Sequence, residues 1–115
     1  MSWLAVSGLA GASAVAAGAA GAHMIKMENE NFRSIYNVGS QYHLVHSVAL
    51  ASAALGLKAG RKKNIVCGAF SLGIILFSGS CYTVTLMKQR KPYSYPAPIG
   101  GTAFIIGWLA LGLIP

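Results

Sequence analysis

The chain has 115 residues, of which 55% are hydrophobic and only 10% are charged, against about 25% charged residues in an average soluble domain. This length allows one domain, and the composition favours an integral membrane protein over a soluble one. The net charge of +7 does not indicate nucleic-acid binding, because the basic residues gather between apolar runs, as in loops that flank bilayer spans, and not along one soluble face.

Four apolar runs predict an all-α integral membrane bundle of four transmembrane helices, which forms a single domain over residues 1–115. The expected spans are about 3–24, 39–58, 65–87 and 99–114. A short interfacial helix, separate from the second span or continuous with it, is expected between the first two spans. Asn29 provides its cap, and the two acids of the chain, Glu28 and Glu30, flank that position.

The first span carries no charge and is rich in small residues at helical spacing, namely Gly8, Gly11, Ala14, Gly18 and Gly21. Small residues at this spacing let helix backbones approach closely, so this helix is predicted to lie at the centre of a tight bundle. The alternative is a cleaved signal peptide with a small-residue site near Gly21 and Ala22. A signal peptide has a basic region before its apolar stretch, which this segment lacks, so we expect it to be retained.

The second and third spans each carry a polar stripe. Tyr42 and His46 share one seam of the second helix with small residues, whereas Leu44 and Val48 lie on the opposite face, which suits lipid. In the third span, Ser78 and Tyr82 share a stripe at the same helical spacing. Polar groups are costly in lipid, so the two stripes are predicted to face each other inside the bundle.

Hairpin connections bring polar residues of several spans toward one side of the membrane, and this candidate interior cluster consists of His23, Tyr42, His43, His46, Ser78, Ser80 and Tyr82. One interpretation makes the three histidines a metal site, since His ligands at i and i+3 can bind one ion. The favoured interpretation has His46 bonded to a hydroxyl group of the third span, with His23 and His43 among the lipid headgroups. A proton-responsive His46 is an intermediate hypothesis.

Catalysis is not predicted. A pairing of Ser78 with His46 lacks a carboxylate to orient the imidazole, because both acids lie in the first loop. The Gly-rich first span is too apolar to be a phosphate-binding loop. The spans carry no charged residue at their middle that would mark an ion path. We therefore expect no enzyme activity, no cofactor and no metal ion.

Two basic clusters are candidate contacts for anionic lipid such as cardiolipin, and they consist of Arg61, Lys62 and Lys63 in one loop and Lys88, Arg90 and Lys91 in another. With Lys58, the first loop places four cations on one side of the membrane. The other side has five, because Lys26 and Arg33 join the second cluster. Since these counts are so close, the positive-inside rule selects no orientation.

Short motifs also occur in a specific order: Gly21-Ala22-His23, Tyr42-x-x-x-His46, Phe77-Ser78-Gly79-Ser80-x-Tyr82, and Pro98-x-Gly100-Gly101 followed by Gly107-Trp108. Together they resemble the transmembrane protein 256 family of small four-helix membrane proteins, related to bacterial YwdK-like proteins. The resemblance covers nearly the whole chain and implies the fold and topology, but no activity. His43 stands where bacterial members usually have Gln and is similar to animal members, which implies the mitochondrial inner membrane as the location.

We therefore predict a non-catalytic membrane protein that serves as an accessory or structural subunit of a larger complex, for example a respiratory complex of the mitochondrial inner membrane. Its expected partners are membrane lipids and other membrane subunits, not nucleic acid. The alternative is a small oligomeric transporter or channel, and a weaker alternative is a metal or proton sensor that uses the histidines.

Overall fold

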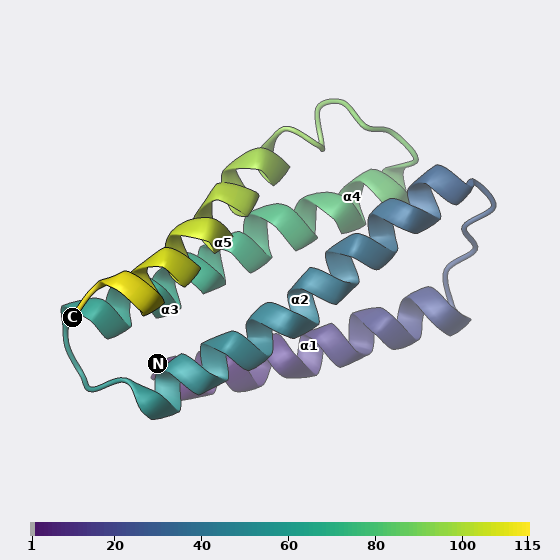
Figure 1. Ribbon diagram of the computed structural model, residues 1–115. Coiled ribbons are helices and arrows are strands. Elements are labelled where there is room, and N and C mark those ends of the chain that lie inside the picture. The colour runs from purple at the N-terminus through teal and green to yellow at the C-terminus, as the bar shows by residue number, and fades with distance from the viewer. Residues whose placement is uncertain (1) are drawn as a thin grey trace.

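The computed structural model describes residues 2–115, and the secondary structure in that range is helical throughout (Figure 1). The elements are α1 (Trp3–His23), α2 (Glu30–Gly56), α3 (Arg61–Gly73), the π-helix η1 (Ile74–Ser78), α4 (Gly79–Met87) and α5 (Pro96–Leu113). Because α3, η1 and α4 follow one another without a break, they form one rod. The bundle therefore has four long rods and measures 46 × 25 × 21 Å.

Three of the four rods are long and apolar enough to cross a membrane, namely Trp3–His23, Arg61–Met87 and Pro96–Leu113. The fourth, α2, has 27 residues, which corresponds to about 40 Å of helix. Its length therefore suffices, but polar side chains in its first half lower its hydropathy. The predicted all-helical membrane architecture is confirmed, whereas the fourth span stays a prediction.

A separate interfacial helix does not form. Asn29 caps α2 as expected, since its Oδ1 accepts a hydrogen bond from the backbone N–H of Asn31 at 2.8 Å. The helix then continues without interruption into the apolar half. Contacts with other helices hold its first turns in place, because the Thr85 hydroxyl donates to the Phe32 carbonyl at 3.0 Å and the Tyr36 hydroxyl bonds α1.

The predicted central position of α1 is wrong. This helix packs along one side of α2 and contacts the start of α3, and only Ser7 and Ala14 are buried in it. Small side chains offer little apolar area to bury, so the centre belongs to helices with larger residues. Gly21 does serve close packing, because the Tyr36 ring occupies the space of a Cβ, but Gly8 faces open space.

The core lies between α2, the α3–η1–α4 rod and α5, and its largest fully buried side chains include Leu50, Val66 and Phe70. Two glycines make room for aromatic rings, since a Cβ on Gly73 or Gly107 would collide with Phe104 or Phe70 respectively. Both α2 and α5 pack mainly on the rod rather than on each other. Contacts between α2 and α5 are therefore made by side chains.

The two ends of the bundle hold different connections between the helices. The indole N–H of Trp3 donates to Asn64 Oδ1 at 3.0 Å, which joins the start of α1 to the first turn of α3, next to the turn between α2 and α3. That turn depends on Gly60, whose φ of 150° is strained for any residue with a Cβ. Both termini lie toward this end (Figure 1), whereas the α1–α2 and α4–α5 connections, with Glu30 and Arg90, lie at the other.

Candidate functional site

His43 connects three helices from a buried position on α2. Its Nδ1 lies 2.8 Å from the Tyr82 hydroxyl of α4, and its Nε2 lies 3.1 Å from Ser13 Oγ of α1. The Ser13 hydroxyl donates to the Ala10 carbonyl at 2.9 Å, so its oxygen accepts the bond from the imidazole. Both hydroxyl partners of His43 can donate or accept, and the bond from Ser13 to Ala10 favours the neutral tautomer with its proton on Nε2 and with Nδ1 as the acceptor from Tyr82.

His46 lies one turn further along α2 in different surroundings. Its Nδ1 lies 2.8 Å from the Tyr42 carbonyl, and the Trp108 indole of α5 donates to its Nε2 at 3.0 Å. Because an indole N–H can only donate, Nε2 is the acceptor and the proton is on Nδ1. The imidazole also stacks on Phe104, with ring centroids 3.7 Å apart and an interplanar angle of 14°.

The serines of the predicted cluster bond backbone carbonyls and do not bond the histidines. The Ser78 hydroxyl donates to the Gly39 carbonyl of α2 at 2.7 Å, and the Ser80 hydroxyl donates to the Tyr93 carbonyl in the connection to α5. Both side chains are buried. They therefore fasten the third rod to α2 and to the loop before α5.

His23 lies apart from the other two histidines. It is exposed at the end of α1, ten residues after Ser13, or roughly 15 Å along the helix. Within residues 2–115, no three His, Cys, Asp or Glu side chains are grouped so that they could hold a metal ion. The lone pairs of His43 and His46 also accept hydrogen bonds from Tyr82 and Trp108, so neither ring offers a free nitrogen.

Two expectations about the histidines are thus corrected. His46 does not bond a hydroxyl of the third span, since its partners are Tyr42 and Trp108, and the Tyr82 hydroxyl bonds His43 one turn earlier. His43 is not exposed to its surroundings as an environment of wet headgroups would require, but is buried in the bundle at 6% exposure. Gly39 fits this register, because a Cβ there would collide with Cys81, so the absence of a side chain lets α2 lie close to the third rod at that level.

Two partners were not predicted as part of the site. Ser13 is one of two serines within the apolar part of α1, and an isolated hydroxyl in an apolar helix is a signal for a bond to a neighbouring helix. Trp108 carried a signal too, since an indole N–H needs an acceptor. The sequence does not indicate which acceptor the indole bonds, because α2 and α5 pack mainly on the third rod and not on each other.

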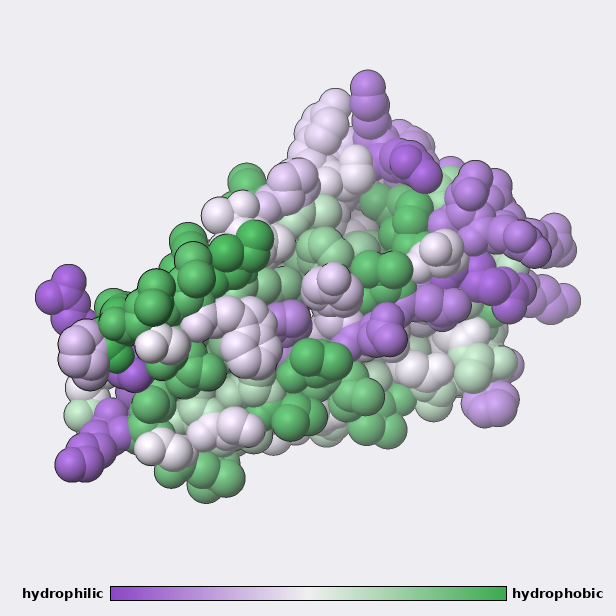
Figure 2. Space-filling view, viewed as in Figure 1, coloured by the Kyte–Doolittle hydropathy of each residue, from purple (hydrophilic) through white to green (hydrophobic). Residues whose placement is uncertain are grey.

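A groove runs along the outer surface between α2 and α5, and its lining includes Tyr42, His46, Phe104 and Trp108; it has a volume of about 470 Å³. Tyr42 and Trp108 are 44% and 47% exposed. In Figure 2, hydrophilic side chains extend from one end of α2 toward the middle of this face, between hydrophobic surfaces. We call the groove lined by Tyr42, His46, Phe104 and Trp108 the α2–α5 groove.

Comparison with known proteins places the chain among small membrane proteins. Residues 17–101 match the sequence model of a family described as "Protein of unknown function (DUF423)". The chain is 32% identical to a UPF0382 membrane protein of Haemophilus influenzae, over 95% of this chain and 89% of the relative.

Two further relatives show the same level of similarity. The UPF0382 membrane protein YwdK of Bacillus subtilis is 32% identical over 85% of this chain and 82% of its own length. The UPF0382 inner membrane protein YgdD of Escherichia coli K12 is 32% identical over 82% of this chain and 73% of its own. The expected similarity to YwdK-like proteins is therefore confirmed. No solved structure matches the chain.

Proposed function

We propose, on the premise that this chain belongs to the DUF423 family of membrane proteins, that it is a non-catalytic accessory subunit which binds another membrane protein laterally. The partner is a transmembrane helix that lies against α2 beside the α2–α5 groove and presents a polar group there. A second copy of this chain, as in an oligomeric transporter, is the competing occupant.

The observation that carries this proposal is the exposure of Gln41 on α2. If α2 spans the bilayer with Gly56 at one boundary, Gln41 lies about 22 Å from that boundary. The hydrocarbon core is about 30 Å thick, so the amide lies within it. Lipid tails cannot hydrogen-bond an amide, whereas a polar group on a neighbouring helix can. Gln41 directly precedes Tyr42, which lines the groove.

The interior of the bundle supports a packing role over catalysis or conduction. Every buried side-chain nitrogen and oxygen atom within residues 2–115 has a hydrogen-bond partner. The bonds of His43 and His46 join α1, α2, α4 and α5 to one another. A network with this geometry rigidifies the bundle, and it leaves the outer surface as the region available for recognition.

Photo-crosslinking in native membranes tests the proposal. A photoreactive residue in place of Gln41 should crosslink to a different membrane polypeptide, which also co-purifies with the wild-type chain in a fixed ratio after mild extraction. Leu55 is the matched control, because it lies on the same helix and is 73% exposed; a probe there should label lipid. Gln41→Leu should weaken co-purification roughly threefold to twentyfold, which corresponds to the loss of one interhelical hydrogen bond.

Two outcomes contradict the proposal. Crosslinking of Gln41 to a second copy of the chain would favour the oligomeric transporter, which flux measurements on the reconstituted protein would then examine. Labelling at position 41 that matches the Leu55 control would remove the evidence for any protein partner at this face.

We also propose the mitochondrial inner membrane as the location. His43, which resembles the animal-type pattern, supports this, and a relative is named an inner membrane protein of Escherichia coli. Fractionation of cells that express a tagged chain should recover it with inner-membrane markers after removal of the outer membrane. Recovery with another membrane would contradict the location but would leave the proposed lateral binding intact.

A further inference from the structure

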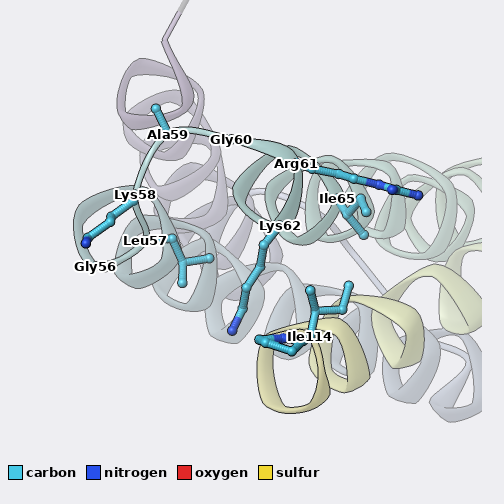
Figure 3. A pocket seen from close by; sticks show the side chains of 10 residues that line it. Gly56, Leu57, Lys58, Ala59, Gly60, Arg61, Lys62, Ile65 and Ile114 are labelled. Carbon is cyan, nitrogen blue, oxygen red and sulfur yellow. The ribbon is translucent and has the colours of Figure 1, made fainter.

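A basin opens at the end of the bundle where α2 turns into α3, and Figure 3 shows its lining. Its volume is about 770 Å³. One wall is apolar and combines Leu57 after α2, Ile65 of α3 and Ile114 after α5. The other lining residues include Lys58 and Lys62, and the Lys62 side chain extends from α3 toward Ile114 (Figure 3).

The charged side chains that line this basin are all basic. Lys58, Arg61 and Lys62 line it, and no acidic residue is among its lining residues. The two acids of the chain belong to the opposite end of the bundle, before and at the start of α2. No acidic side chain of the lining therefore offsets the three cations, and an anion is the complementary ligand.

The second basic cluster, formed by Lys88, Arg90 and Lys91, has different surroundings. Lys88 lines a smaller pocket of about 350 Å³ together with Lys26 and Glu28, so an acid accompanies the cations there. The basin combines cations with an apolar wall, whereas this pocket combines charges of both signs. The two clusters predicted to contact anionic lipid are thus not equivalent.

We propose that the basin at the α2–α3 turn is a binding site for an anionic phospholipid. The lipid phosphate lies beside the amines of Lys58 and Lys62, and an acyl chain lies along the apolar wall near Ile65 and Ile114. The position suits a lipid, because the basin is at the end of helices long and apolar enough to cross a membrane, where headgroups lie. This inference does not depend on the proposed accessory role.

Native mass spectrometry of the full-length protein in neutral detergent tests the site. Titration with dioleoyl-phosphatidylglycerol should give saturable binding that is stronger than binding of dioleoyl-phosphatidylcholine. The double substitution Lys58→Gln/Lys62→Gln should weaken phosphatidylglycerol binding roughly 25-fold, because each cation near a charged lipid surface contributes about fivefold. The matched control Lys88→Gln/Lys91→Gln should change it by less than about fivefold.

A further set of measurements distinguishes binding of a lipid from binding of free phosphate. Glycerol 3-phosphate and inorganic phosphate carry the charge without the acyl chains, so they should not compete at concentrations that match the lipid. The substitution Ile114→Asn should weaken phosphatidylglycerol binding while it leaves the cations in place. Equal binding of both lipids, equal losses in the two double variants, or full competition by inorganic phosphate would each overturn the proposal.

Discussion

His43 and His46 lie one turn apart on α2, yet their imidazoles make different hydrogen bonds. His43 bonds side chains of two other helices, Tyr82 and Ser13, and carries its proton on Nε2. His46 bonds its own helix at one nitrogen and Trp108 at the other, and carries its proton on Nδ1. The indole N–H of Trp108 can only donate and so fixes the tautomer of His46, whereas the tautomer of His43 is inferred from the bond of Ser13 to Ala10.

The difference teaches that burial alone does not define the role of a histidine in a membrane bundle. Both rings are nearly equally buried, at 6% and 5% exposure. The interactions of His43 are hydrogen bonds between helices, whereas those of His46 are divided between one such bond and the stack on Phe104. Substitutions that remove bonds or stacking selectively should therefore affect the two positions differently.

The largest effect is expected from His43→Leu. This change removes two bonds between helices and leaves the Tyr82 hydroxyl without its imidazole partner, so we expect a loss of about 1–2 kcal/mol in the free energy of unfolding. His46→Leu should lose less hydrogen bonding, since only Trp108 belongs to another helix. Unfolding in mixed micelles measures both variants. A larger loss for His46→Leu would show that stacking outweighs the bonds.

A smaller effect is expected from His46→Phe, which keeps a ring on Phe104 but removes the acceptor for Trp108. The expected loss is about 0.6 kcal/mol, the average for a hydrogen bond between membrane helices. Trp108→Phe should lose a similar amount, and the double variant should lose no more than either single one, because both remove the same bond. Additive losses in this cycle would contradict the bond.

Much of the general arrangement follows from sequence periodicity. The lipid-facing side predicted for α2 is exposed, with Leu44 and Val48 at 48% and 60%. Ser78 and Tyr82 of the third rod face α2 as expected, but they bond Gly39 and His43 and not Tyr42 or His46, and Tyr42 is 44% exposed. Periodicity predicts such faces because it reports which residues share one side of a helix. It contains no information about how far one helix slides along another.

That missing information explains the errors at the site. A shift of α2 by one turn along the third rod would decide whether Tyr82 meets His43 or His46. This register involves the close contact of Gly39 with Cys81, which is a property of the two helices together. The peripheral position of α1 was missed for a related reason. Its small residues permit close packing but do not require it on every side, as Gly11 shows by facing open space.

A still smaller loss is expected from Ser13→Ala. Ser13 is exposed on α1, and its bond to His43 at 3.1 Å is longer than that of Tyr82, so the loss should stay below about 0.6 kcal/mol. Ser52→Ala is the matched control, since the Ser52 hydroxyl bonds only the Val48 carbonyl of its own helix. Unfolding in mixed micelles that ranks the control above Ser13→Ala would argue against the link from α1 to His43.

The last prediction concerns which ring nitrogen of each histidine carries the proton, and its test does not depend on a change in the stability of the protein. Nitrogen-15 NMR of histidine-labelled protein should show one ring protonated on Nε2 and one protonated on Nδ1, with both rings neutral. Tyr82→Phe removes the donor to Nδ1 of His43, so it should shift the signals of that ring and leave those of His46 in place. Trp108→Phe should do the reverse, because its indole sets the tautomer of His46 alone. Two rings with the same tautomer would contradict the assignment of protons to Nε2 of His43 and Nδ1 of His46. A Tyr82→Phe spectrum in which both rings move would show that the two histidines belong to one coupled network.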